Sequence, residues 1–116
     1  MFTRRALDDK INGFLSELES NNFRVAKAIL FGSYATGKVN ENSDIDLAVW
    51  LYNFPEKHWT EIPVIPHIVA KYSPISPKFY DVNETGKDDP FIEVIENTGR
   101  VIDTVRFTLL NTINSL

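Results

Sequence analysis

Apolar and polar positions recur along the chain with two different periods, and these periods predict its helices and strands. From Thr3 to Ser20 the apolar side chains follow one another at steps of one, three and four, which places them on one face of a helix. The residues of that face are Leu7, Ile11, Phe14, Leu15 and Leu18. Asn21 and Asn22 come next and are typical of a helix end. We therefore expect a helix from about Thr3 to Ser20.

Two strands are predicted after this helix. Val25 to Phe31 is a compact apolar run rich in strand-forming residues, and the pair Gly32-Ser33 ends it. Residues 44–50 have a period-two pattern, which places Asp44 and Asp46 on one face of a strand. The opposite, apolar face consists of Ile45, Leu47 and Val49.

The middle of the chain is harder to interpret. Residues 56–72 look helical in parts, but Pro63 and Pro66 would break or kink a continuous helix. Phe79 to Asn83 is predicted as a third strand, with Phe79, Asp81 and Asn83 on one face.

The last third predicts a helix, a strand and a second helix. Pro90 to Asn97 suits a short helix with Pro90 in its first turn and Gly99 as its C-terminal cap. Arg100 to Asp103 follows as a fourth strand. From Thr104 a helical apolar stripe runs to the end of the chain, through Val105, Leu109, Ile113 and Leu116. This helix leaves apolar surface for a partner or a second copy.

This order of elements indicates one α/β (α+β) domain over residues 1–116, a small mixed sheet flanked by helices. The chain is 43% hydrophobic and 24% charged, the balance of a soluble globular protein. It has no cysteine, no signal-like start and no run of about 18 apolar residues, so we expect a cytoplasmic protein without a membrane segment. The net charge of −4 argues against direct nucleic-acid binding.

The chemistry is concentrated between the first and second strands. A Gly-Ser turn after a strand lets a triphosphate approach the backbone closely. Two carboxylates two residues apart on a strand, Asp44 and Asp46, project from one face and can share hard divalent cations. Two metals about 3.5–4 Å apart would hold the attacking and leaving oxygens in line. Asp81, on the third strand, is the candidate for a third carboxylate.

The Gly-Ser pair, ten intervening residues and Asp-x-Asp resemble the signature of the DNA polymerase β-type nucleotidyltransferase superfamily. They look most like its small minimal nucleotidyltransferase (MNT) branch. The likeness runs through AILFGSYATGKVNENSDIDLAVW, continues in FYDVNET and ends with DPFIEVIENTGRVID. It implies a polymerase β-like nucleotidyltransferase fold and Mg²⁺-dependent use of ATP.

The resemblance also implies roles for individual residues. Gly32 and Ser33 would contact the triphosphate of ATP. Asp44 and Asp46 would bind both of two Mg²⁺ ions, whereas Asp81 would bind the catalytic ion and help to deprotonate the acceptor.

The sequence departs from the family at Thr36, where members often carry an arginine that faces phosphate. Lys38 would supply a nucleotide-binding cation in its place. A P-loop is the competing motif, because Gly32-x-x-x-x-Gly37-Lys38 matches it up to the last position. Val39 lacks the required hydroxyl and the expected strand begins within five residues, so the P-loop reading fails.

In the MNT branch many members are antitoxins paired with a helical HEPN-domain RNase toxin. The resemblance implies that they silence the toxin by transferring AMP from ATP to one of its tyrosines. One alternative is an antitoxin that inhibits by docking, with weak or no catalysis. Another is a nucleotidyltransferase subunit that acts on a small molecule or RNA, with a partner subunit supplying part of the acceptor-binding site. A glycosyltransferase with the same acidic pair is disfavoured, because it needs a larger domain.

Simpler explanations exist for the acidic residues. Asp44 and Asp46 would also suit a charged strand face that discourages aggregation. A lone Asp near a strand end, such as Asp81, is often a turn residue. His58 and His67 have no metal-ligand spacing with other His or Cys, and we assign them no role.

Overall fold

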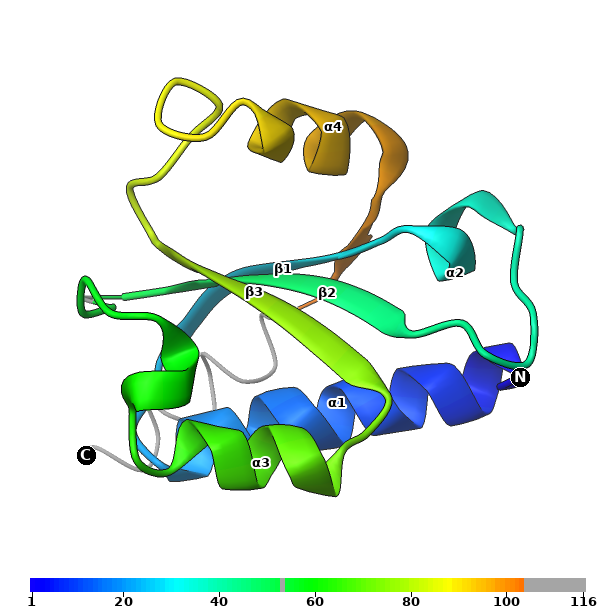
Figure 1. Cartoon of the computed structure of the whole chain (residues 1–116), viewed down its shortest axis with the longest axis horizontal. Helices are drawn as coiled ribbons and strands as arrows, with labels where there is room; N and C mark the ends of the chain where they lie inside the picture. The colour runs from blue at the N-terminus through cyan, green and yellow to red at the C-terminus, as the bar shows by residue number, and fades with distance from the viewer. Residues whose placement is uncertain (53, 104–116) are drawn as a thin grey trace.

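One mixed sheet of four strands forms the centre of the computed structural model, which describes residues 1–52 and 54–103. Its strand order is β3-β2-β1-β4 (Figure 1). The strands are β1 (Val25–Phe31), β2 (Ile45–Leu51), β3 (Ile75–Asp81) and β4 (Arg100–Ile102). β1 pairs antiparallel with β2 and with β4, whereas β2 and β3 are parallel. The predicted small mixed sheet flanked by helices is confirmed.

Helices cover both faces of this sheet (Figure 1). They are α1 (Arg4–Ser20), α2 (Ser33–Thr36), the 3₁₀ turn η1 (Trp59–Glu61), α3 (Ile65–Lys71) and α4 (Phe91–Thr98). α1 and α3 lie side by side on one face, and α4 lies on the other (Figure 1). The short α2 follows β1 at the end of the sheet where β2 begins.

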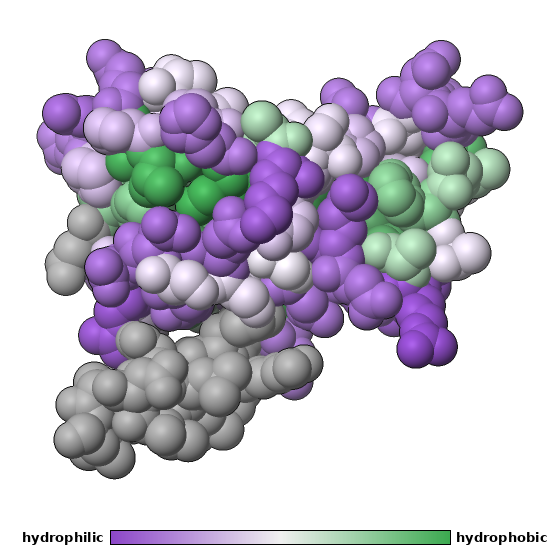
Figure 2. All heavy atoms as spheres, turned by 90° about the horizontal axis from the view of Figure 1, so that it is seen from below, coloured by the Kyte–Doolittle hydropathy of each residue, from purple (hydrophilic) through white to green (hydrophobic). Residues whose placement is uncertain are grey.

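The first helix forms where its apolar period predicted. Thr3 caps it, since its hydroxyl accepts a hydrogen bond from the Ala6 N–H at 3.1 Å. All five residues of the predicted apolar face are buried. Hydrophilic side chains dominate the outward surface of the α1 and α3 layer, with apolar atoms gathered in separate patches (Figure 2).

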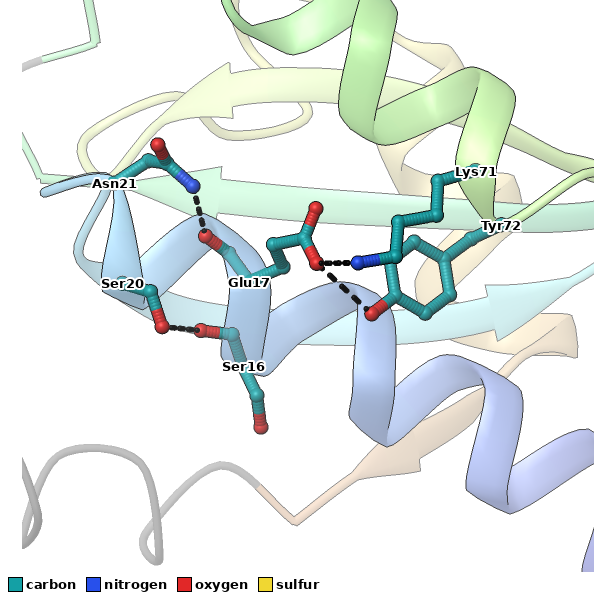
Figure 3. A network of polar contacts seen from close by, with 6 residues as sticks. All are labelled: Ser16, Glu17, Ser20, Asn21, Lys71 and Tyr72. Carbon is teal, nitrogen blue, oxygen red and sulfur yellow. Dashed lines mark hydrogen bonds and ion pairs between the residues drawn. The ribbon is translucent and has the colours of Figure 1, made fainter.

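Polar contacts link α1 to α3 at the edge of this layer (Figure 3). The Lys71 ammonium lies 2.6 Å from a carboxylate oxygen of Glu17, and the Tyr72 hydroxyl donates to the same oxygen at 3.2 Å. These bonds hold the pKa of Glu17 below its usual range. The C-terminal end of α3 is thereby tied to the last turns of α1.

The sheet separates two apolar cores. The larger lies between the sheet and α1 and α3, and it includes Phe14, Leu15, Leu30, Ile45, Leu47, Val49, Ile68 and Ile75. The smaller lies under α4 and consists of Ile29, Ala48, Trp50, Tyr80, Ile92 and Ile95. Ile45, Leu47 and Val49 share the larger core, which confirms the predicted apolar face of β2.

The third strand begins earlier than predicted. It runs over Ile75–Asp81 instead of Phe79 to Asn83. Pro77 is a reason to doubt a strand there, but β3 is at the edge of the sheet, where proline is tolerated. As expected, the prolines of the middle segment prevent a continuous helix: α3 starts at Ile65, with Pro66 in its first turn.

The predicted Pro90 to Asn97 helix and the fourth strand are both present as α4 and β4, within one residue at each end. Gly99 ends α4 in extended backbone, with φ −91° and ψ 170°. A Cβ atom there would meet the Ile95 carbonyl oxygen at 2.6 Å and the Leu30 carbonyl oxygen at 2.8 Å. Glycine is therefore needed for close packing of this turn against β1.

The predicted C-terminal helix from Thr104, with its partner surface, lies outside the described residues. In the part of the chain that the structure describes, no helix has the length and apolar character needed to cross a membrane.

Candidate functional site

The turn between β1 and α2 adopts a conformation that depends on glycine. Gly32 has φ 71° and ψ −151°, a region that side chains disfavour. Its carbonyl oxygen accepts hydrogen bonds from the Ala35 N–H at 3.0 Å and the Thr36 N–H at 3.1 Å. These bonds close the single turn of α2, which ends at Gly37 with φ 82°. Ser33 is thus the first residue of α2 and is partly buried.

Asp46 lies directly against this turn. It is the second residue of β2 and pairs with Phe31, the last residue of β1. A Cβ atom built on Gly32 would collide with the Asp46 carboxylate. Antiparallel pairing therefore brings the predicted glycine and the predicted carboxylate into contact, although 13 residues separate them in the sequence.

Asp44 and Asp46 form an electrostatic pair at this end of the sheet. Asp44 is exposed just before β2, whereas Asp46 is half-buried. Burial raises the pKa of Asp46, and the negative charge of Asp44 raises it further. A divalent cation bound between the two carboxylates would offset both effects, which is the electrostatic character expected of an oxygen-ligand cation site.

Lys38, the predicted nucleotide-binding cation, is exposed on the loop after Gly37. Its backbone N–H donates to the Ser33 carbonyl oxygen at 3.2 Å, so the loop stays attached to α2. The structure thus gathers Gly32, Ser33, Asp44 and Asp46 around one turn, with Lys38 on the adjoining loop.

The prediction that Asp81 joins Asp44 and Asp46 is wrong. In the parallel pairing of β2 with β3, Asp81 lies beside Leu51, whereas Ser76 lies beside Asp46. Five residues along a strand correspond to about 16 Å. Asp81 also alternates with Tyr80, so it lies on the face opposite to that of Asp46.

The Asp81 carboxylate instead organises the loops at the far end of the sheet. Its two oxygens accept hydrogen bonds from the Phe54 N–H at 3.2 Å and the Asn83 N–H at 3.1 Å. This is the turn role that an isolated Asp near a strand end often has. Asp81 was expected beside Asp44 and Asp46, but its place depends on the direction in which β2 and β3 pair. The local pattern of either strand does not encode that direction.

Two residues of β3 that the sequence analysis missed lie near the acidic pair. Ser76 and Lys78 are both exposed, and they share with Tyr80 the face covered by α4. The Lys78 ammonium lies 5.5 Å from the ring centre of Phe91 on α4. The signal for both residues is the alternation of buried and exposed positions over residues 75–78, which a strand beginning at Phe79 does not include.

The donor set fits one hard divalent cation better than two. Two carboxylates on one strand, with phosphate oxygens and water, suffice for a single Mg²⁺. In the described part of the chain, no group of three or more His, Cys, Asp or Glu is placed to hold a metal ion.

Residues 9–115 match a family described as a nucleotidyltransferase domain. No curated protein matches the chain. The match covers the Gly32 turn, both carboxylates of the pair and all four strands.

Proposed function

This chain belongs to the nucleotidyltransferase domain family, and on that premise we propose that it moves AMP from ATP to a hydroxyl group of a partner protein. Members of this family transfer nucleotidyl groups and generally use a nucleoside triphosphate with a divalent metal. The choice of AMP and of a protein acceptor belongs to the proposal.

The observation that carries the proposal is the contact between Gly32 and Asp46, with Asp44 two residues away. The missing side chain of Gly32 leaves room for the Asp46 carboxylate directly beside a turn whose backbone N–H groups can donate to phosphate. The adjoining carboxylates would hold the Mg²⁺ that accompanies the triphosphate and lowers the charge on its oxygens. The backbone N–H groups that would bind phosphate and the carboxylates that would bind the metal ion thus lie at the same turn.

The transfer itself is a displacement at the α-phosphorus. The acceptor hydroxyl oxygen forms a bond to that phosphorus, while the bond to the oxygen bridging the α- and β-phosphates breaks. The electron pair of the broken bond leaves with pyrophosphate, and the hydroxyl proton passes to water. The chain's contribution is to hold the triphosphate against the Gly32 turn so that the attacking and leaving oxygens lie in line.

We propose that the acceptor is a tyrosine of a HEPN-domain RNase toxin and that this chain is its cytoplasmic antitoxin, as in the MNT branch. The support for a protein acceptor is the resemblance to this branch, which includes the Gly-Ser turn and Asp-x-Asp.

The test is intact-mass analysis of the cognate partner after incubation with this chain and Mg-ATP. We expect the partner to gain one or more AMP units. Asp44→Asn and Asp46→Asn should each lower the transfer by at least tenfold, because one carboxylate cannot replace the pair as a cation site.

Asp81→Asn is the matched control, since it removes a carboxylate of the same type at the far end of the sheet. It should leave the transfer unchanged. A partner whose mass does not change with the unaltered chain would contradict the proposal, as would full transfer by Asp46→Asn.

An antitoxin that acts by docking, with weak or no catalysis, is the second candidate. It is favoured by one observation: Asp81, the third predicted carboxylate, is on the opposite face from Asp46 and about five residues along the sheet. Co-expression separates the two functions. If the double variant Asp44→Asn, Asp46→Asn still binds the partner and protects cells from it, docking is sufficient.

A further inference from the structure

β3 lies beside Asp46 and supplies its neighbouring side chains on the same face of the sheet. Registered residues of neighbouring strands have side chains on the same face, about 4.8 Å apart at the backbone. Ser76 is the residue registered with Asp46, and Lys78 is registered with Ala48, one side-chain repeat further along. Any β3 side chain that shares a ligand with Asp46 must come from these two positions.

Neither position supplies an acid. Ser76 has a neutral hydroxyl, and Lys78 has an ammonium group that is positively charged at neutral pH. Both side chains are exposed on the face that α4 covers only in part. The location of the Lys78 ammonium on this face is established by its distances of 5.5 Å to the Phe91 ring and 5.9 Å to the Tyr80 ring.

From this arrangement we infer that the site takes one divalent cation with its nucleotide, and that Lys78 supplies the positive charge that a second cation would otherwise provide. The inference rests on the proposed nucleotide binding at the Gly32 turn. The ligand of this site would be a nucleoside triphosphate that carries one metal ion. One further phosphate oxygen of that ligand would contact the Lys78 ammonium.

Charge balance supports this assignment. A second divalent ion would need further anionic ligands, yet on this face β3 supplies no carboxylate to the pair Asp44 and Asp46. The Asp89 carboxylate lies over the same face but accepts a hydrogen bond from the Tyr80 hydroxyl at 3.0 Å, four strand positions beyond the residue registered with Asp46. The ammonium of Lys78 would repel that ion while attracting the triphosphate. A lysine also binds phosphate as a point charge, without the geometric demands of a metal ion.

The experiment counts ions directly. The full chain is titrated with Mn²⁺ in the presence of α,β-methylene-ATP, a nucleotide that cannot be transferred, and bound Mn²⁺ is quantified by electron paramagnetic resonance. We expect one ion per nucleotide-bound chain. Lys78→Met should weaken nucleotide binding roughly tenfold and leave the ion count unchanged. Lys87→Met, which removes an exposed lysine from the loop between β3 and α4, is the matched control and should bind normally.

Ser76→Asp adds the missing carboxylate next to Asp46 on an exposed edge position. It should raise the count to two ions, whereas Ser76→Asn, of the same size but without charge, should not. Circular dichroism of both variants verifies that they fold. Two ions on the unaltered chain would overturn the inference while leaving the proposed transfer intact. One ion without transfer to the partner would instead contradict the proposed function, and failure to bind the nucleotide would contradict both.

Discussion

At the scale of single residues, position 32 combines a backbone constraint with a steric one. The φ of +71° is unfavourable for any residue with a side chain, and the space a Cβ would need is filled by the Asp46 carboxylate. Gly37 shares the backbone constraint, with φ +82°, but has no neighbouring atom within 4 Å of an added Cβ. The two glycines therefore separate the effect of conformation from that of contact.

We predict that Gly37→Ala lowers the free energy of unfolding by about 1 kcal/mol and leaves nucleotide binding unchanged. Gly32→Ala should lower it further and abolish nucleotide binding, because it also displaces Asp46. Chemical denaturation and calorimetric titration with Mg-ATP measure the two effects. Equal nucleotide affinities of the two variants would show that the contact with Asp46 is unimportant for binding.

At the scale of elements, the last turn of α1, next to the start of β1, contains a carboxylate in an unfavourable setting. One oxygen of Glu19 accepts a hydrogen bond from the Val25 N–H at 2.8 Å, and its other oxygen, Oε2, is buried without a hydrogen-bond partner. Burial raises the pKa of Glu19, and the Val25 hydrogen bond and the charge of Arg24 offset this only in part. The end of α1 is thus positioned against β1 by an acid that is partly desolvated.

The raised pKa of Glu19 predicts a pH dependence of stability. A carboxyl whose pKa is higher in the folded state destabilises the fold when it is ionised, and this penalty disappears as the pH falls through the folded pKa towards 4.5. Glu19→Gln cannot ionise, so the difference in unfolding free energy between it and the unaltered chain should change between pH 7 and pH 4.5. Urea denaturation at a series of pH values measures this difference.

Glu17 also contributes to the pH dependence of the unfolding free energy, and its contribution must be separated from that of Glu19. The hydrogen bond and charge of Lys71 lower the pKa of Glu17, so its contribution has the opposite sign. Its stabilisation is present above pH 4.5 and is lost as the pH falls through its folded pKa. Comparing Glu19→Gln with the unaltered chain cancels the Glu17 contribution, which both share. A pH-independent difference would contradict the role given to Glu19.

At the scale of the whole molecule, the two cores are unequal. α1 and α3 pack against the larger core, whereas α4 depends on a smaller one and leads into a strand of three residues. Local opening of a protein begins where buried apolar contacts are few. We therefore expect α4 and β4 to open before β1 and β2, the strands that form the candidate site.

A pair of core substitutions tests this inequality. Leu15→Ala, in the larger core, should lower the global free energy of unfolding by about 2–5 kcal/mol. Ile95→Ala, in the smaller core, should accelerate amide hydrogen exchange mainly in residues 91–102. Residues 25–31 should keep their protection in that variant. Uniform loss of protection would mean that both cores unfold as one unit.

The sequence was sufficient for the features that depend on neighbours along the chain. The apolar period located α1, and the period-two pattern of residues 44–50 assigned Asp44 and Asp46 to one side and the apolar residues Ile45, Leu47 and Val49 to the other. The spacing of the Gly-Ser turn and Asp-x-Asp also predicted the family, which the match over residues 9–115 confirms. The helix and strand inferences use residues within a single element, where backbone geometry determines the period, and the family signature uses one continuous segment of the chain.

The composition of the site depended on contacts between distant segments. The direction and register of β3 beside β2 put Ser76 next to Asp46 and moved Asp81 to the other end and the other face. No local period specifies which strand pairs with which, because that choice is made by burial of the α1–α3 core and by the crossover through α3. A shift of one residue in that register would reverse every side chain of β3, so only the folded chain determines which ligands the site contains.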